Sequence, residues 1–142
     1  MRLTVHDQDD LPEARLVEAG LDATNAAVVA LRNVRPLIVL AREQGETVVG
    51  GAVGRTWGAC CELRQLWVED SHRGRGVGTR LVREFERRAA ERGCTLVYLE
   101  TFSFQAKPFY EKTGYQVAAS IEGFDDGIVK YFMTHDLRSQ KP

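Results

Sequence analysis

Apolar residues recur at every third or fourth position over residues 77–92, and this spacing predicts an amphipathic helix. Gly93 stops the pattern, as glycine often does just past the C-terminal end of a helix. The apolar positions are Val77, Leu81, Val82, Phe85 and Ala89. This stretch is the strongest helix signal in the chain.

Three other stretches have weaker helical character. Asp9 or Asp10 can serve as the N-cap of a helix that Gly20 ends. A second helical pattern covers residues 22–34, and a short helix is predicted over residues 105–114. The chain therefore has four predicted helices, of which two precede the first long strand.

Apolar runs of strand length occupy much of the remaining chain. They are residues 3–5, 37–42, 47–56, 60–70 and 95–101, followed by a hairpin over residues 115–137. The predicted element order is β-α-α-β-β-β-α-β-α-β-β, without an internal repeat or a linker. This order is typical of an α+β fold, a mixed sheet with helices packed on it, and we expect a single domain spanning residues 1–142.

Composition narrows the class of protein. A chain of 142 residues with 44% hydrophobic and 27% charged residues can bury a core of its own. No apolar run approaches the roughly 20 residues that span a bilayer, and the first residues lack a signal-peptide core. We therefore expect a cytoplasmic protein with no membrane partner. Cys60, Cys61 and Cys94 lack zinc-ligand spacing, so we expect buried thiols and no metal site.

Charge is distributed unevenly along the chain. The net charge is −1, yet residues 73–92 carry seven arginines against three glutamates. A short basic segment on an acidic body favours a local anionic ligand. It argues against nucleic acid, for which a broad basic face is expected, and the sequence pI is about 6.3. The arginines of the helix itself can instead form ion pairs with glutamates one turn away.

The basic segment opens with "RGRGVG", residues 73–78, where glycines alternate with larger residues directly before the helix. Glycine lets a ligand approach the backbone, and a helix N-terminus binds phosphate. A P-loop is excluded because Thr79 and Arg80 follow Gly78 where lysine is required. A dinucleotide-binding turn is disfavoured because Thr79 replaces its third glycine and "EDSH" separates strand from loop.

The remaining pattern is R-x-x-G-x-G, formed by Arg73, Gly76 and Gly78. It resembles the pyrophosphate-binding motif of the GNAT superfamily of N-acetyltransferases, which use acetyl-CoA. "LWVEDSHRGRGVGTRLV" is similar to the strand, loop and helix of that family, and "AKPFYEKTGY" is similar to its C-terminal motif. The resemblance implies a mostly antiparallel sheet of about six to seven strands flanked by about four helices. It also implies a splayed parallel pair of strands at the cofactor cleft.

The same resemblance implies which residues hold acetyl-CoA. The pantetheine arm would pair with the backbone of the strand before the loop, and the pyrophosphate would lie on the loop and first helical turn. Ser103 stands where many family members have an asparagine that contacts the cofactor. The implied cofactor-binding residues are Leu66, Trp67, Val68, Arg73, Gly74, Arg75, Gly76, Val77, Gly78, Thr79 and Ser103.

Catalytic roles also follow from the resemblance. Tyr110 matches the tyrosine that protonates the departing thiolate, and Glu62 matches a glutamate that serves as general base in some members. Glu100 and Asp70 are weaker candidates for the base. A backbone N–H near Trp67 or Val68 would stabilise the oxyanion. The histidines, His6, His72 and His135, are expected to be surface or packing residues.

The sequence thus predicts an acetyl-CoA-dependent N-acetyltransferase acting on a small amine or on an amine of a protein. The alternative is a module with the same fold that binds acyl-CoA and catalyses little. A homodimer is compatible with either hypothesis. The acceptor would be framed by residues 20–35 and 121–128, which carry no substrate signature apart from the acidic Glu122, Asp125 and Asp126.

Overall fold

The structure is a computed structural model that describes residues 1–139. It divides the chain into two compact units, residues 1–32 and the residues from 33 onward. The single domain expected from the sequence stays a prediction. None of the helices within residues 1–139 is both long enough and apolar enough to cross a membrane.

The N-terminal unit differs from its predicted form. Helix α1, Ala14–Ala26, runs through Gly20, and only one 3-10 turn, Val29–Leu31, follows it. A glycine inside a helix costs only about 1 kcal/mol, so Gly20 does not end it. Neither Asp9 nor Asp10 caps the helix, because Glu13 occupies that position. Residues 3–5 form no strand, since an isolated strand leaves its backbone groups unpaired.

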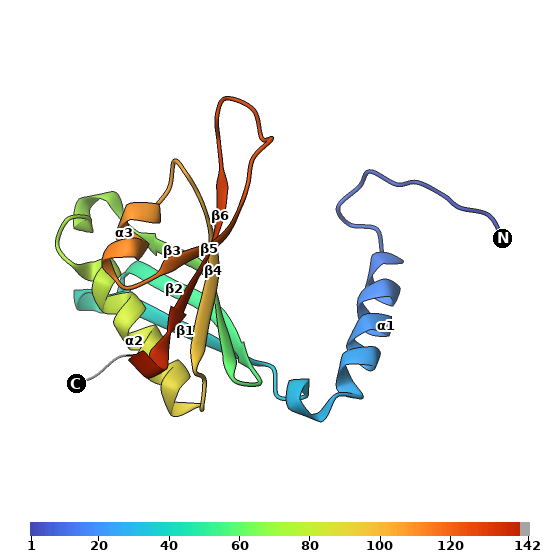
Figure 1. Ribbon diagram of the computed structural model, residues 1–142, viewed down its shortest axis with the longest axis horizontal. Helices are drawn as coiled ribbons and strands as arrows, with labels where there is room; N and C mark the ends of the chain where they lie inside the picture. The colour runs from blue at the N-terminus through green and yellow to red at the C-terminus, as the bar shows by residue number, and fades with distance from the viewer. Residues whose placement is uncertain (140–142) are drawn as a thin grey trace. The chain divides into compact units, whose positions relative to one another are not determined.

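The larger unit is built on one six-stranded sheet, whose strands lie in the order β1-β2-β3-β4-β6-β5 (Figure 1). Strands β3 and β4 are parallel, and every other neighbouring pair is antiparallel. This confirms the predicted mixed sheet with a central parallel pair. The strands are β1 Arg35–Arg42, β2 Val48–Trp57, β3 Cys60–Val68, β4 Leu96–Phe102, β5 Gln116–Ile121 and β6 Lys130–Asp136.

Two helices belong to this unit. Helix α2, Val77–Glu91, packs on β1, β2 and β3, and buries the apolar side that its sequence pattern predicted. Helix α3, Lys107–Lys112, is a short connection between β4 and β5, and its buried residue is Tyr110. With α1, the described residues have three α-helices, fewer than the four expected, because the second N-terminal pattern does not form one.

A bulge in β3 separates the parallel strands. Val53 pairs with Gln65 but the next residue, Gly54, pairs with Leu63, so that Arg64 is the extra residue. A side chain at position 54 would clash, because its Cβ would lie 1.9 Å from a backbone oxygen of β3. Past the bulge, β3 and β4 no longer pair: their ladder ends at Leu63 and Leu99, although the strands continue to Val68 and Phe102. The splay opens a gap beside the start of α2.

The core lies between α2 and the sheet. It includes Cys61 and Cys94, both buried, while Cys60 is half-buried, and all three are free thiols. Burial raises the pKa of Cys61 to about 12, which keeps the thiol neutral and unreactive. The prediction of buried cysteines is confirmed for two of the three. No cluster of histidine, cysteine, aspartate and glutamate side chains among residues 1–139 is placed to bind a metal ion.

Candidate active site

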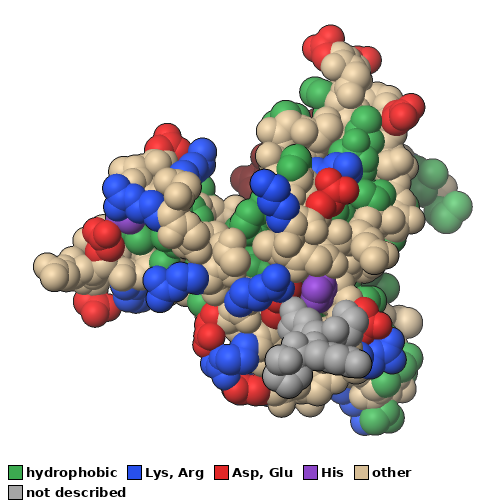
Figure 2. All heavy atoms as spheres, turned by 60° about the vertical axis from the view of Figure 1, so that its left-hand side comes forward, with side chains coloured by type: hydrophobic (Ala, Val, Ile, Leu, Met, Phe, Trp, Pro, Cys, Tyr) green, Lys and Arg blue, Asp and Glu red, His purple; other side chains and the backbone are tan. Residues whose placement is uncertain are grey.

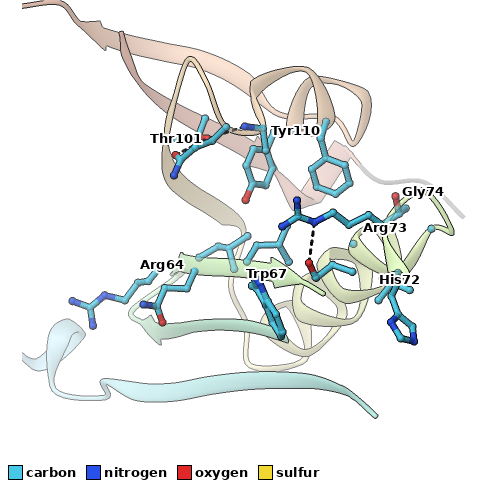
Figure 3. Close-up of a pocket in the computed structure, with 18 of the residues that line it drawn as sticks. Arg64, Trp67, His72, Arg73, Gly74, Thr101 and Tyr110 are labelled. Carbon is cyan, nitrogen blue, oxygen red and sulfur yellow. Dashed lines mark hydrogen bonds between the residues drawn. The ribbon is translucent and has the colours of Figure 1, made fainter. Parts of the chain in front are cut away.

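A cleft of about 910 Å³ occupies the gap between β3 and β4 (Figure 3). Its volume is in the upper part of the range for small-molecule sites, roughly 300–1,000 Å³. Four segments form its walls: β3, the loop that leads into α2, the end of β4, and α3 with the loop before it. The lining residues are Leu63 to Val68, His72, Arg73, Gly74, Gly76 to Thr79, Glu100, Thr101, Phe104 to Ala106, Phe109 and Tyr110.

The glycine loop lies at one end of the cleft. Gly74 and Gly76 have left-handed backbones, with φ of 75° and 80°, and a Cβ added at either would meet no protein atom within 4 Å. The space beside both glycines is therefore open to a ligand. Gly78 differs, because its Cβ would lie 3.4 Å from the ring of Phe109. That glycine allows α2 and α3 to pack closely.

The N-terminus of α2 faces the same cleft. Its first backbone bond runs from the Arg80 N–H to the Gly76 carbonyl, and Gly76, as N-cap, has no side chain to satisfy the earlier N–H groups. The N–H groups of residues 77–79 are thus without helical partners, and the helix dipole adds partial positive charge. Backbone N–H groups beside open glycines make a site suited to the oxygens of a phosphate.

The two arginines of the loop have different positions. Arg73 folds back across the cleft wall, where its Nε donates to the Val68 carbonyl at 2.9 Å and its guanidinium pairs with Asp70 at 3.1 Å (Figure 3). It therefore braces the loop against the end of β3. Arg75 is exposed and does not line the cleft, and its side chain makes no hydrogen bond or ion pair within residues 1–139.

His72 is held by two carboxylates. Its Nε2 lies 2.6 Å from Glu43 Oε1, and its Nδ1 lies 3.2 Å from Glu69 Oε2. The side chain is 15% exposed and lines the cleft. The sequence predicts a surface or packing role for His72, and in the structure it fastens the turn before the loop to the β1–β2 connection. Its main partner lies 29 residues away in the sequence, so no local pattern indicates this contact.

Strand β3 presents backbone groups to the gap. The Glu69 N–H bonds to the Val49 carbonyl on the β2 side. Because backbone groups of successive residues in a strand point in opposite directions, the N–H groups of Val68 and Leu66 face away from β2 and toward the gap. Trp67 lines the cleft with its half-exposed side chain, while its own N–H faces β2.

Tyr110 forms the opposite wall. Only 6% of the residue is exposed, and its hydroxyl points into the cleft toward β3 (Figure 3). Its ring meets those of Phe109 and Tyr115 edge to face, with centroids 5.3 and 5.5 Å apart. Tyr115 is anchored in turn, because its hydroxyl donates to the buried Glu86 at 2.9 Å. Burial raises the pKa of Tyr110 to about 12, so the phenol remains a proton donor at neutral pH.

Like Arg75, the predicted site residues Glu62 and Ser103 lie outside the cleft lining. Glu62 Oε1 is shared by the Nε atoms of Arg55 and Arg64, at 3.1 and 3.2 Å. Ser103 faces the start of β6: its N–H donates to the Val129 carbonyl at 2.8 Å, and its Oγ accepts from the Val129 N–H at 3.0 Å. Ser103 therefore holds the loop before α3 in place without reaching the cleft itself.

Several cleft residues were not singled out by the sequence reasoning. Gln105 Oε1 accepts from the Phe102 N–H at 2.8 Å and from the Thr101 hydroxyl at 3.4 Å, which fixes the loop between β4 and α3. Phe104 projects from the same loop. A glutamine and a phenylalanine in a loop give no local signal of such roles, because the roles depend on where the loop crosses the sheet edge.

Beyond the loop, the arginines of α2 pair with glutamates. Arg83 donates to the buried Glu86 at 2.9 Å, and Arg87 and Arg88 contact glutamates one turn away on the exposed face. The expected ion pairs along the helix are confirmed. Three of the seven arginines of residues 73–92 are thus paired with glutamates of the helix, whereas Arg75 and Arg80, in and just after the loop, make no ion pair within residues 1–139.

The chain is similar in sequence to known acetyltransferases. The model of the Acetyltransferase (GNAT) family matches residues 4–115. The chain is 38% identical over 126 residues to the blasticidin-S acetyltransferase of Streptomyces morookaense, a match covering 82% of this chain and 92% of that protein. It is 28% identical over 127 residues to the acetyltransferase Atu2258 of Agrobacterium fabrum, which covers 89% and 93% of the two chains.

Solved structures share the fold. A crystal structure of an acetyltransferase from Bacillus cereus superposes with a TM-score of 0.81 at 26% identity, over 93% of this chain and 97% of the other. A crystal structure from Agrobacterium tumefaciens superposes with a TM-score of 0.89 at 26% identity, over 96% and 99% of the two chains.

Proposed function

The chain belongs to the GNAT family of acetyltransferases, and we propose that it moves the acetyl group of acetyl-CoA to a primary amine by direct attack of the amine on the thioester. Acetyl-CoA is the co-substrate of the family, and this chain is an N-acetyltransferase. One observation carries the proposed mechanism: the glycine loop at the start of α2, the splayed edge of β3 and the hydroxyl of Tyr110 share a single cleft.

The cleft has the groups that this cofactor requires. The N–H groups of residues 77–79 and the open faces of Gly74 and Gly76 would receive the pyrophosphate, with Arg73 and Arg75 adding positive charge at the rim. The backbone of residues 66–68 would pair with the pantetheine arm in place of β4, which has diverged there. Ser103 would contribute by fixing the loop that borders the arm.

Attack requires a neutral amine. An alkyl ammonium has a pKa of about 10.4, so its neutral form at pH 7 costs roughly 4 to 5 kcal/mol unless a base takes the proton. Glu62 is the proposed base, and it would act through water because its carboxylate does not line the cleft. Glu100 lines the cleft and is the alternative, whereas Asp70 does not line it and its side chain is 89% exposed to solvent. Replacement of each glutamate by glutamine, with a pH profile of kcat/KM, decides between the two.

The tetrahedral oxyanion needs a donor that is already in place. The Val68 N–H faces the gap, and the carbonyl of the same residue accepts a hydrogen bond from Arg73 Nε, which fixes the backbone there. A preorganised donor of this kind contributes roughly 2.7 to 4 kcal/mol to transition-state stabilisation. We assign the oxyanion contact to Val68 rather than to Trp67, whose N–H faces β2.

Tyr110 is the proposed general acid for the departing thiolate. The thiol formed has a pKa of about 8.5, so protonation assists departure at neutral pH. Tyr110 is suited to this role because its hydroxyl points into the cleft and aromatic contacts on two sides fix its ring (Figure 3). General acid catalysis typically contributes about 10²–10⁴-fold, and a leaving group this acidic needs the lower part of that range.

The acceptor is proposed to be a small molecule. The blasticidin-S acetyltransferase, which by its name acts on an antibiotic, matches over 82% of this chain. Free cysteines suit a reducing compartment, so we place the reaction in the cytoplasm.

A panel of amines tests the proposal. Polyamines, aminoglycosides, amino acids and peptides are incubated with acetyl-CoA, and release of the coenzyme A thiol is followed together with the acetylated amine. We expect at least one small amine to give both products in equal amounts. Tight acetyl-CoA binding without amine-dependent thiol release would instead identify a binding module. A heat-shift assay with an oligonucleotide should show no stabilisation.

A further inference from the structure

Three phenylalanine rings form an aromatic cluster beside the cleft: Phe102 at the end of β4, Phe104 in the loop before α3, and Phe124 in the β5–β6 loop. The rings of Phe102 and Phe104 are stacked, with centroids 5.3 Å apart and planes 9° from parallel. Phe124 meets Phe102 edge to face at 5.2 Å. Phe102 and Phe104 are two residues apart, whereas Phe124 belongs to a separate loop whose ring the fold brings to theirs.

The cluster is exposed although it is apolar. Phe104 is 67% exposed and Phe124 is 41% exposed. Single apolar residues are common on protein surfaces, but contiguous aromatic patches next to a cleft are typical of ligand sites. Phe104 also lines the cleft, so the cluster continues the cleft wall outward from the gap between β3 and β4.

The surroundings of the cluster favour a cation. The Lys130 Nζ lies over the rings of Phe102 and Phe124, 5.0 and 5.7 Å from their centroids, and 3.5 Å from Glu100 Oε2. The cluster and Glu100 thus already hold one ammonium group through ring faces and a carboxylate. Glu100 lines the cleft and is half exposed, so one side of the carboxylate remains open to solvent.

Acidic residues add to this field. The β5–β6 loop carries the exposed Glu122, Asp125 and Asp126, and Figure 2 shows acidic side chains at the tip of this hairpin. These three carboxylates share the loop of Phe124, and Glu100 pairs with Lys130, so acidic groups outnumber the one lysine that contacts the cluster. The potential around the cluster is therefore negative, which would draw a protonated amine toward the cleft.

We propose that the aromatic cluster and Glu100 form the acceptor subsite, and that the acceptor is a cationic amine carrying a flat, unsaturated ring. This inference rests on the proposed acetyl transfer. The ring of the acceptor extends the stack begun by Phe102 and Phe104. Glu100 and the hairpin attract the protonated amine, which is the dominant form in solution at pH 7. Stacking on Phe104 then directs the amine into the cleft, where the wall formed by Phe104 meets that of Tyr110.

Two amines of equal charge isolate the role of the ring. Phenethylamine and cyclohexylethylamine share the ethylamine chain, but only the first has a flat, unsaturated ring. With acetyl-CoA saturating, kcat/KM for phenethylamine should exceed that for cyclohexylethylamine by about three- to tenfold, the range expected for one aromatic pair. Binding of both amines to the complex with coenzyme A, followed by calorimetry, should show the same preference without turnover.

Two variants connect the preference to the cluster. Phe104→Leu and Phe124→Leu keep an apolar side chain but remove the ring, so each should raise KM for phenethylamine, leave kcat unchanged and reduce the preference. Phe124 does not line the cleft, so its substitution should leave acetyl-CoA affinity unaltered. Ile38→Ala is the control, because it truncates an apolar residue on β1, away from the cluster, whose exposure of 57% lies between those of Phe104 and Phe124.

The outcomes separate this inference from the proposed function. The coenzyme A complex could bind phenethylamine in preference to cyclohexylethylamine while no amine is acetylated. That result would support the acceptor subsite and refute the proposed acetyl transfer. Equal binding of the two amines by the wild-type protein, or equal losses for both in Phe104→Leu, would overturn the subsite. The subsite would also be overturned if sedimentation shows a dimer that Phe124→Leu dissociates, because the aromatic cluster would then be a subunit interface.

Discussion

Gly76 offers a direct test of the cofactor site, because its neighbourhood separates the effect on folding from the effect on binding. The residue has φ of 80°, and a Cβ added there would meet no protein atom within 4 Å. In Gly76→Ala the new methyl group therefore extends into the open cleft without a steric clash. The left-handed backbone alone should cost about 1–2 kcal/mol of stability.

Gly93 provides a matched control at the opposite end of the same helix. It has φ of 89°, and its Cβ would also meet nothing within 4 Å, but it lies outside the cleft. Gly93→Ala should lower the free energy of unfolding by the same amount as Gly76→Ala, as measured by urea denaturation. Any difference between the two in acetyl-CoA affinity then reports contact with the ligand rather than backbone strain.

The expected difference in affinity follows from one lost contact. A methyl group at position 76 would keep the pyrophosphate from the N–H groups of the first helical turn. Loss of one hydrogen bond to a charged group costs about 1.5–3 kcal/mol, which corresponds to a rise in Kd of about ten- to a hundredfold. Calorimetric titration with acetyl-CoA should show this rise for Gly76→Ala and none for Gly93→Ala. Equal Kd values for both variants and the wild type would refute the assignment of the loop.

Other substitutions test the remaining parts of the account. Tyr110→Phe should reduce kcat by about 10- to 100-fold with acetyl-CoA affinity unchanged, as stopped-flow and calorimetry can measure. Burial raises the pKa of Tyr110 from 10.0 to about 12. The buried neutral hydroxyl therefore stabilises the fold below pH 10, and this stabilisation is lost between pH 10 and 12. In urea titrations, Tyr110→Phe should lose less stability than the wild type across that pH window. Arg73→Ala should weaken acetyl-CoA binding about tenfold, whereas Arg87→Ala, which removes an arginine paired within the helix, should not. Gly54→Ala should cost more than about 3 kcal/mol of stability, because its Cβ would lie 1.9 Å from the Glu62 carbonyl oxygen, and a wild-type melting curve would contradict the bulge geometry.

The parts of the site that lie close together in the sequence were predictable. Residues 66–82 contain the strand, the glycine loop and the helix as one block, and local patterns of glycine and apolar spacing determine each of them. The structure forms these elements nearly where the sequence places them, and the parallel pair beside them is also confirmed. The position of Tyr110 on a short helix followed from the same kind of local signal.

Contacts that depend on strand register were not predictable. Arg55 lies directly across the ladder from Glu62, and the bulge at Arg64 brings a second guanidinium to the same carboxylate. A change of register by one residue would turn Glu62 to the other face of the sheet, so the sequence alone could not show its pairing. The aromatic cluster depends similarly on where two loops meet. The predicted strand over residues 3–5 and the predicted separate helix over residues 22–34 are wrong for another reason. Both patterns are weak, and the N-terminal unit buries no residue of α1 that could support them.

Amide hydrogen exchange with and without acetyl-CoA tests the central claim most directly, because it locates the bound cofactor without knowledge of the acceptor. Acetyl-CoA should slow exchange at the N–H groups of Val68 and of residues 76–79, while Gly93 and the strand β5 exchange as before. Exchange that is unchanged along the loop and β3 while the protein is saturated with acetyl-CoA would contradict the placement of the cofactor in this cleft.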